Sequence, residues 1–374
     1  MSTCGIAVTN VVVRSEVPEG RPRAAPAGAP VQRLALSGSD PAMARNLLTG
    51  ALGPRLEAGA RRHAGRLADY VAIARPDHWF KNVFMLPGAA LAFVLSGEMP
   101  ASALGSLLLG IVSTCLIVSA NYTINEWLDA PFDRHHPVKR HRPSAAGRIN
   151  GKAVYLQWGL LAAAGLGLGA LISPYFLLFS ALLLVMAGVY NVPPLRTKDR
   201  HYLDVLSESI NNPLRLLLGW SAVVSDVLPP SSIVLAYWMG GAYLMAIKRY
   251  AEYRFIADPV RAGLYRRSFR FYTEQSLLVS AFYYALSCAF FLGVFLIKYR
   301  IEFLLCMPFL ALLFAWYLTI GMRTQSAAQN PERLYREKSF VAYVGALALL
   351  ITLLFFVDLP WLNVLVEHHS LPLH

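Results

Sequence analysis

The residues best suited to chemistry follow a strongly apolar run that ends near residue 120. Residues four apart share one face of a helix, so four polar residues form a single stripe: Asn121, Asn125, Asp129 and Asp133. Glu126 flanks the stripe three residues before Asp129. Mg²⁺ prefers oxygen ligands and is commonly held by one or two carboxylates together with substrate phosphates. The stripe therefore predicts a magnesium site whose ligands are Asn125, Glu126, Asp129 and Asp133, with Asp129 and Asp133 also catalytic.

A dense basic segment follows the stripe and contains Lys139, Arg140 and Arg142. Lys and Arg form strong, charge-assisted hydrogen bonds with phosphate oxygens. We expect these three side chains, with Asn121, to bind a phosphorylated substrate. In the alternative interpretation, the acids only neutralise neighbouring bases in an ordinary loop. The coincidence of acidic spacing, a membrane edge and adjacent bases favours the chemical interpretation.

A second polar constellation follows a later apolar run. Pro193 and Pro194 cannot continue a helix, so they predict a loop, which includes Lys198, and a new helix from about Tyr202. Polar residues then recur every three to four positions on one face: Asp204, Glu208, Asn211 or Asn212, and Arg215. Ionisable groups inside a span are costly and usually line a cavity. We expect catalytic roles for Asp204 and Glu208, and substrate binding by Lys198 and Arg215. The alternative is an internal ion pair of Glu208 with Arg215 or with a neighbouring helix.

A third polar cluster occupies residues 245–276, where bases, acids and aromatic residues alternate. Lys248 and Arg249 are expected to bind substrate phosphate, as is Lys81 from the segment 75-RPDHWFKN-82. In the alternative interpretation, the basic residues of this loop only set the orientation of the protein in the membrane, as Lys and Arg do in cytoplasmic loops. That interpretation explains the bases but not the accompanying Glu252. Three loops would then supply charged groups to one rim of the protein.

The elements that must position these residues are membrane helices. Hydrophobic residues make up 56% of the 374-residue chain, and the apolar runs approach the roughly 20 residues that cross a bilayer. An all-α polytopic membrane protein with nine transmembrane helices is predicted. The expected spans are residues 83–97, 102–122, 153–172, 174–190, 205–224, 231–247, 277–297, 302–321 and 339–357. The first is short, and polar residues interrupt the fifth.

Loop charge predicts the orientation. Lys and Arg gather in the loops on one side, which are expected to be cytoplasmic. The candidate site and the N-terminus should therefore face the cytoplasm. The net charge of +12 is explained by this asymmetry and by a bound anion, without a nucleic acid partner.

The two ends of the chain differ from the apolar middle. Residues 1–65 are rich in Ala, Gly, Pro and Arg and lack a helical or strand period, which predicts a disordered cytoplasmic extension. Residues 66–357 are expected to form the transmembrane catalytic domain, and residues 358–374 a short extracytoplasmic tail. The four cysteines show no close pairing and are expected to be packing residues.

The predicted helix count, the two acidic clusters, 125-NEWLDAPFD-133 and 137-PVKRHRPSAAG-147 together resemble the UbiA superfamily of intramembrane prenyltransferases. The family's first motif reads Asn-Asp-x-x-Asp-x-x-x-Asp, and Glu126 stands where the family usually has Asp. The resemblance covers about residues 68–357. It implies a UbiA-like helical bundle with cytoplasmic cap loops, a Mg²⁺ cofactor, a polyprenyl lipid substrate, a phosphorylated donor and a bacterial inner (plasma) membrane location.

Within that superfamily, 75-RPDHWFKN-82 and 247-IKRYAEYR-254 look most like the members that move 5-phosphoribosyl from phosphoribosyl pyrophosphate onto a polyprenyl phosphate. The second acidic motif is closer in style to the members that transfer a prenyl group to an aromatic acceptor. Both functions stay open, and a transporter of an anionic lipid or metabolite is a third alternative.

Overall fold

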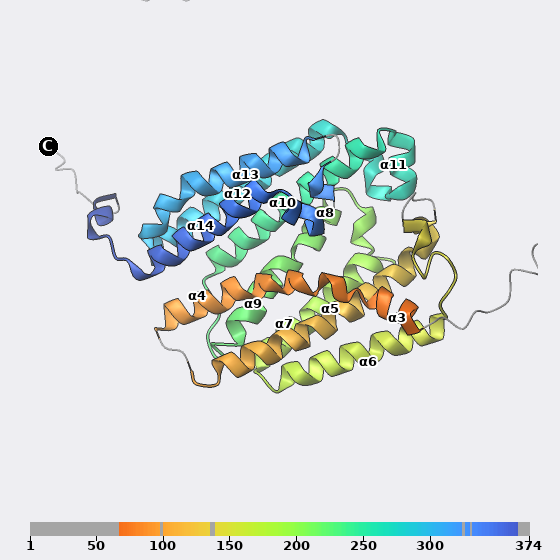
Figure 1. Cartoon of the computed structure of the whole chain (residues 1–374), viewed down its shortest axis with the longest axis horizontal. Helices are drawn as coiled ribbons and strands as arrows, with labels where there is room; N and C mark the ends of the chain where they lie inside the picture. The colour runs from red at the N-terminus through yellow and green to blue at the C-terminus, as the bar shows by residue number, and fades with distance from the viewer. Residues whose placement is uncertain (1–66, 98–99, 135–138, 324–325, 330, 366–374) are drawn as a thin grey trace, which may run out of the picture. The chain divides into compact units, whose positions relative to one another are not determined.

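The computed structural model describes residues 67–97, 100–134, 139–323, 326–329 and 331–365, and they belong to one compact unit. All regular secondary structure in these ranges is helical (Figure 1), as the sequence predicts. The predicted N-terminal extension, residues 1–65, lies outside the described residues, as does the end of the predicted tail.

The α-helices are α3 (Leu67–Ala74), α4 (Leu86–Ser96), α5 (Ala103–Asp133), α6 (Gly151–Ala170), α7 (Pro174–Asn191), α8 (Leu203–Ser209), α9 (Asn211–Ser221), α10 (Ser231–Ile256), α11 (Pro259–Tyr265), α12 (Glu274–Tyr299), α13 (Met307–Gly321) and α14 (Lys338–Phe356). Short 3₁₀ segments connect them: η1 (Pro76–Met85), η2 (Lys139–His141), η3 (Thr197–Asp199), η4 (Arg267–Arg270), η5 (Ile301–Cys306), η6 (Ala327–Gln329), η7 (Pro331–Arg336) and η8 (Pro360–Leu365).

Six helical segments of the described chain are long and apolar enough to cross a membrane: Leu67–Ser96, Ala103–Asp133, Gly151–Ala170, Pro174–Asn191, Glu274–Tyr299 and Ile301–Gly321. A shorter apolar stretch, Lys338–Leu354, lies where the ninth span is expected. Helix α10 is long but is not among the six. The predicted number of nine is therefore not confirmed, whereas an integral membrane protein with several apolar spans is.

The expected fifth span is divided into α8 and α9, which meet at Ile210. The preceding α7 ends at Asn191, just before Pro193 and Pro194, and α8 begins one residue after Tyr202. The prolines therefore end a helix as predicted. This break matters for the site because α8 carries two acids and α9 begins with two asparagines.

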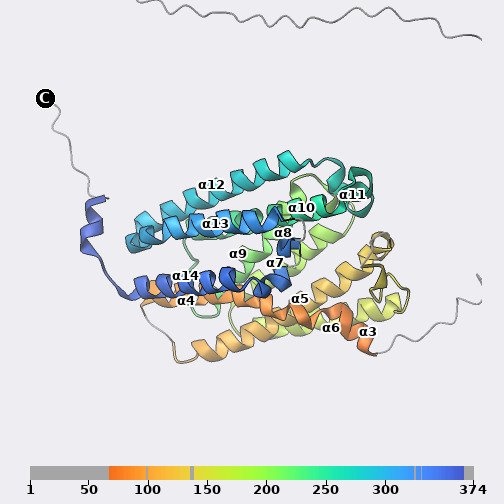
Figure 2. The same ribbon diagram turned by 45° about the horizontal axis from the view of Figure 1, so that its top comes forward.

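Helix α9 is held in place by an unusually close contact with α4. Gly88 of α4 lies against the backbone of Leu216, and Gly219 of α9 lies against the backbone of Met85. A Cβ atom at either glycine would overlap a backbone carbonyl of the facing segment. Small residues allow membrane helices to approach in this way. Elsewhere α10 packs along α12 and α5 along α6 (Figures 1 and 2).

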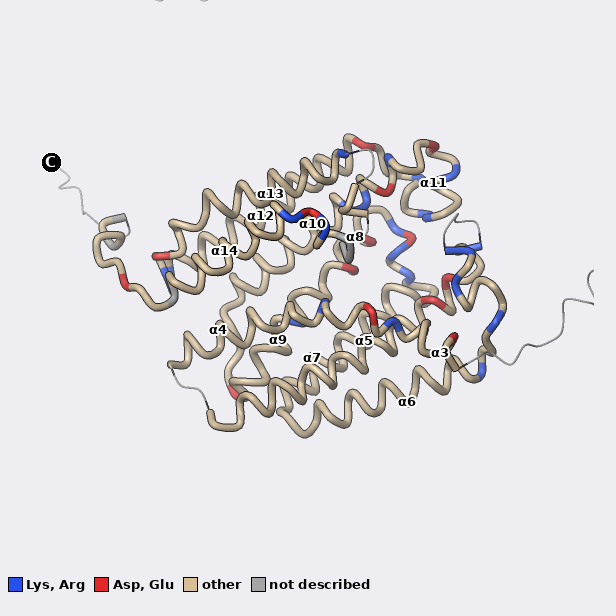
Figure 3. The backbone as a smooth tube through the Cα atoms, in the orientation of Figure 1, with Lys and Arg blue, Asp and Glu red and all other residues tan. Residues whose placement is uncertain are grey.

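Most charged residues gather at one end of the bundle. Figure 3 shows Lys, Arg, Asp and Glu concentrated around α3, α11 and the C-terminal end of α5, while the long helices are largely uncharged. Three separate connections lie at this end, after α5, after α7 and after α10. The fold therefore brings together the loops that sequence reasoning assigned to one rim.

Candidate functional site

Three polar cavities follow one another along the C-terminal half of α5. The inner cavity is lined by Asn121 and Asn125, the middle one by Asn125 and Asp129, and the outer one by Asp129 and Asp133. An α-helix rises 1.5 Å per residue, so the stripe from Asn121 to Asp133 spans about 18 Å. The predicted stripe is thus the common wall of all three cavities.

The middle cavity has a volume of about 160 Å³ and an excess of positive charge. Four acids line it: Glu126, Asp129, Glu208 and Glu252. Eight bases face them: Arg75, Lys81, Lys139, Arg142, Lys198, Lys248, Arg249 and Arg266. Such a lining suits a polyanion. Four of these bases come from the connections after α5, α7 and α10, two from within α10, and Arg75 and Lys81 from the residue before η1 and from η1 itself.

Asp129 is the carboxylate shared by the middle and outer cavities. It accepts hydrogen bonds from Lys198 and from Arg196, the latter at 3.2 Å. Burial lowers the pKa of Lys198 to about 8, against the opposing effect of the Asp129 carboxylate. Arg196 adopts a left-handed backbone conformation, φ 30°, which is costly for a residue with a Cβ atom. The loop after α7 is therefore fixed onto the acidic stripe.

The outer cavity, about 50 Å³, is formed where the loop after α5 meets the α10–α12 connection. Asp133 accepts a hydrogen bond from Arg142 at 2.7 Å. Burial disfavours the charge on Arg142, but Asp133 more than compensates and raises the pKa of Arg142. Lys139 donates to the hydroxyl of Tyr265 in α11. These contacts connect the loop after α5 to α11 at the charged end of the bundle.

The four predicted metal ligands do not converge on one point. Glu126 accepts hydrogen bonds from the backbone and side chain of Ser144, and Asp133 pairs with Arg142. Among the described residues, no three His, Cys, Asp or Glu side chains gather as a metal-binding group. Asn125, Glu126 and Asp129 do line the same cavity, and all three offer hard oxygen donors. These residues could hold Mg²⁺ only if phosphate oxygens of a substrate supply the remaining ligands.

Arg249 of α10 connects three acids. Its side chain is 1% exposed, and its nitrogens donate to Asp204 at 3.3 Å, to Glu252 at 3.1 Å and to Glu208. Because every guanidinium nitrogen has a carboxylate partner, little donor capacity is left for a substrate. The sequence prediction that Arg249 binds substrate phosphate directly is at odds with this geometry.

Asp204 and Glu208, one turn apart on α8, have different surroundings. Asp204 is fully buried and lines none of the described cavities. Its carboxylate accepts from Tyr272 at 2.7 Å and from Ser268 at 3.1 Å. Glu208 lines the inner and middle cavities. Asp204 is thus placed to hold the α10–α12 connection, and only Glu208 can meet a substrate.

The inner cavity, about 100 Å³, is largely uncharged. Its polar lining consists of Asn121, Tyr122, Asn125, Tyr190, Asn191, Glu208, Asn211 and Arg215. Arg215 is buried and donates to Asn82 at 3.1 Å and to the backbone carbonyl of Asn211 at 3.3 Å. Glu208 forms an ion pair with Arg249 of α10 and not with Arg215. Of the two ion pairs considered from the sequence, the structure therefore contains the one with a neighbouring helix.

The other basic residues that were predicted to bind substrate differ in whether they line a cavity. Lys81 and Lys248 line the middle cavity. Arg140 is exposed and lines none of the described cavities, although Arg142, two residues later, lines two. Sequence reasoning did not assign Arg75 or Arg266 to the site; their positions within basic segments were the available signal.

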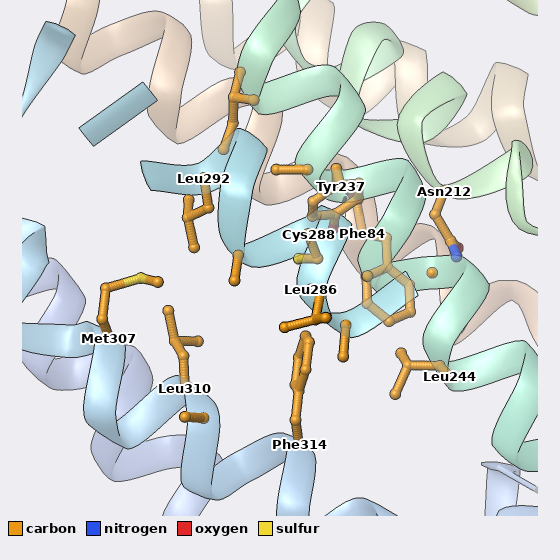
Figure 4. Close-up of a pocket in the computed structure, with 17 residues that line it drawn as sticks. Phe84, Asn212, Tyr237, Leu244, Leu286, Cys288, Leu292, Met307, Leu310 and Phe314 are labelled. Carbon is orange, nitrogen blue, oxygen red and sulfur yellow. Dashed lines mark hydrogen bonds between the residues drawn. The ribbon is translucent and has the colours of Figure 1, made fainter. Parts of the chain in front are cut away.

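A separate apolar cavity of about 460 Å³ lies between α10, α12 and α13 (Figure 4). Its lining includes Phe84, Leu244, Leu286, Leu292 and Phe314, with Asn212 and Tyr237 as its polar side chains. Asn212 follows Asn211 at the start of α9, and Asn211 lines the inner polar cavity. The beginning of α9 therefore separates a polar from an apolar space.

Comparison with known proteins adds relatives of both predicted kinds. Decaprenyl-phosphate phosphoribosyltransferase of Mycolicibacterium smegmatis is 31% identical over 209 residues, covering 55% of this chain and 63% of the relative. Protoheme IX farnesyltransferase of Shouchella clausii is 28% identical over 182 residues, covering 47% of this chain and 58% of the relative. The match spans less than two thirds of either relative's length.

Solved structures support the fold. A UbiA homologue from Archaeoglobus fulgidus, determined with GPP and Mg²⁺, matches with a TM-score of 0.58 at 23% identity, covering 75% of this chain and 99% of that one. The sequence model of the UbiA prenyltransferase family matches residues 84–344. The chain therefore belongs to the UbiA prenyltransferase family and is a membrane transferase.

Proposed function

We propose that this transferase moves 5-phosphoribosyl from phosphoribosyl pyrophosphate to a polyprenyl phosphate at the cytoplasmic face of the membrane. The observation that carries the proposal is the excess of eight bases over four acids around the middle cavity. Two phosphorylated substrates bring more negative charge to one site than a prenyl diphosphate and a neutral acceptor. The relatives that act as decaprenyl-phosphate phosphoribosyltransferases support the same assignment.

The reaction exchanges one bond at the anomeric carbon of the ribose. An oxygen of the lipid phosphate forms a bond to this carbon, and the bond to the diphosphate oxygen breaks with its electron pair leaving on the diphosphate. Lys139, Arg142 and Lys198 line the cavity as fixed donors for that developing charge. Because the lipid phosphate is already anionic, the step needs no protein base.

The donor set on α5 fits a magnesium ion completed by substrate. Asn125 and Asp129 would hold it, and Glu126 and Asp133 are placed to hold Ser144 and Arg142. When bound, the ion would neutralise diphosphate charge as a Lewis acid. We also propose that Asp204 and Arg249 are positioning residues, which keep Glu208 and Glu252 at the cavity wall.

The acceptor needs both an anion site and an apolar channel. Lys81 and Lys248 line the middle cavity and suit the lipid phosphate. The apolar cavity between α10, α12 and α13 suits part of the isoprenoid chain, since hydrocarbon gains free energy by leaving water. Six helical segments of the described chain are long and apolar enough to cross the membrane. We also propose that three more segments cross it, namely α8 together with α9, then α10, and then α14, which gives the predicted total of nine.

A second candidate is prenyl transfer from a prenyl diphosphate to an aromatic or other small acceptor. It is favoured by the family itself and by the farnesyltransferase relatives. Here a base must remove a proton from the acceptor, and Glu208, which faces the cavity, would be the residue for it. Transport is set aside, because the chain belongs to a transferase family.

The test is a donor assay on the purified full-length protein in detergent with magnesium. Radiolabelled phosphoribosyl pyrophosphate and geranyl diphosphate are each offered with decaprenyl phosphate or with 4-hydroxybenzoate as acceptor. A labelled product from phosphoribosyl pyrophosphate and decaprenyl phosphate supports the proposal. A prenylated aromatic product, with phosphoribosyl pyrophosphate left unused, would refute it and support the second candidate.

A further inference from the structure

The inner cavity differs from its neighbours by being lined with amides. Four asparagine side chains line it, Asn121, Asn125, Asn191 and Asn211, and Glu208 and Arg215 are the charged groups of the same lining. The middle and outer cavities are instead lined mainly by charged groups, and the cavity of Figure 4 is almost entirely apolar. Amides donate and accept hydrogen bonds without carrying charge. Their natural ligand is a neutral group with several hydroxyls.

Asn121 has hydrogen-bonding capacity that the described residues do not use. Its Nδ2 donates to the backbone carbonyl of Leu183 at 3.0 Å, which fixes the orientation of the amide. Its Oδ1 is buried and has no hydrogen-bond partner among the described residues. A buried acceptor without a donor costs free energy. A hydroxyl group in the inner cavity would remove that cost.

The inner cavity also adjoins the proposed diphosphate site. Tyr122, Asn125, Tyr190 and Glu208 line both cavities, so a group attached to a diphosphate in the middle cavity reaches the inner one. The two candidate donors differ in this attached group, which is a hydrocarbon in one and a ribose with a 5-phosphate in the other. A hydrocarbon would leave Asn121 Oδ1 without a hydrogen-bond donor, whereas a ribose hydroxyl would satisfy it.

We propose that the inner cavity is the ribose subsite and that Asn121 selects a sugar over a hydrocarbon on the donor diphosphate. This inference rests on the proposed phosphoribosyl transfer. Asn121 acts by accepting a hydrogen bond from a ribose hydroxyl, and Asn211, on the facing segment of the same cavity, contributes a second amide.

The experiment compares two competitive inhibitors on the full-length enzyme, ribose 5-phosphate and inorganic pyrophosphate. In Asn121→Leu, which keeps the side-chain size but removes the amide, the inhibition constant of ribose 5-phosphate should rise roughly tenfold, the effect of losing one hydrogen bond of the stronger neutral kind. The constant for pyrophosphate should stay within about twofold, which is less than the loss of one hydrogen bond. The control is Thr114→Val. Thr114 is also a buried residue of α5, its Oγ1 has no hydrogen-bond partner within the described part of the chain, and it lines none of the described cavities.

A second measurement needs no variant. On the wild-type enzyme, 2,3-dideoxyribose 5-phosphate should inhibit about tenfold more weakly than ribose 5-phosphate. Equal inhibition by the two sugars, or equal shifts for both inhibitors in a folded Asn121→Leu protein, would overturn the ribose subsite. An enzyme that consumes geranyl diphosphate and ignores phosphoribosyl pyrophosphate refutes the proposed function instead, so the two failures are distinguishable.

Discussion

Replacing Arg249 should damage the site by releasing three acids at once. Removing one partner of a buried ion pair typically costs about 3–5 kcal/mol. Arg249 is 1% exposed, and Asp204 beside it is fully buried. We therefore expect Arg249→Met to lower the free energy of unfolding by about 3–5 kcal/mol, enough to prevent isolation of much folded protein.

The milder substitution Arg249→Lys tests the positioning role of Arg249 in a protein that still folds. A lysine retains the positive charge but offers one nitrogen in place of a planar fork that reaches three carboxylates. The protein should fold, and kcat should fall about tenfold to a hundredfold, with little change in KM for the phosphorylated donor, because misplacing groups around the reacting atoms mainly affects the transition state. The matched control is Arg254→Lys on the same helix, whose pair with Glu274 is 39% and 53% exposed.

The measurements are thermal unfolding in detergent and steady-state kinetics. The control should change stability by less than about 1 kcal/mol, as exposed ion pairs do. A large rise in KM with unchanged kcat in Arg249→Lys would show that the guanidinium binds substrate directly, as the sequence alone suggested. It would contradict the positioning role.

Three further predictions follow from the same contacts. Asp129→Asn should fold but lose about a hundredfold or more in turnover, because its carboxylate faces both charged cavities; near-normal turnover in a magnesium titration would contradict this. Gly219→Ala should reduce the yield of folded protein sharply, because its Cβ would overlap the backbone carbonyl of Met85 at the end of η1, as size-exclusion chromatography can show. In a background without Cys4, a cysteine at exposed Val227 should react with an impermeant thiol reagent on intact cells and one at Arg261 should not; the reverse labelling would invert the proposed orientation.

Local spacing was enough to predict the acidic stripe. Asn121, Asn125, Asp129 and Asp133 share a helix face by the fourfold spacing alone, and α5 continues through all four. The prolines at 193 and 194 likewise predicted the interruption before α8. Family membership, inferred from the same motifs, is confirmed by the match over residues 84–344.

Contacts between distant segments could not be predicted in the same way. Arg249 meets Asp204 and Glu208 across more than forty residues, and nothing local distinguishes it from Lys248, which lines the cavity beside it. Arg140 and Arg142 are equally basic in sequence, but the 3₁₀ turn at η2 points only one of them into the cavities. The sequence supplies the charges at the rim, and tertiary packing decides which of them remain available to a substrate.

The polar residues along α5 change from neutral amides to acids toward the C-terminal end of the helix. Asn121 and Asn125, which lie farther into the bundle, are neutral amides, and Asp129 and Asp133, nearer the charged end, are acids. A charged group becomes more costly with depth in the membrane, whereas an amide can be satisfied by neutral hydrogen bonds. The same gradient would orient a donor that carries both a sugar and a diphosphate. Its ribose would lie in the inner cavity, and its diphosphate would leave toward the bases at the charged end of the bundle. A prenyl diphosphate in the same orientation would place hydrocarbon against the amides, which is why the inner cavity is the place where the two candidate functions can be told apart.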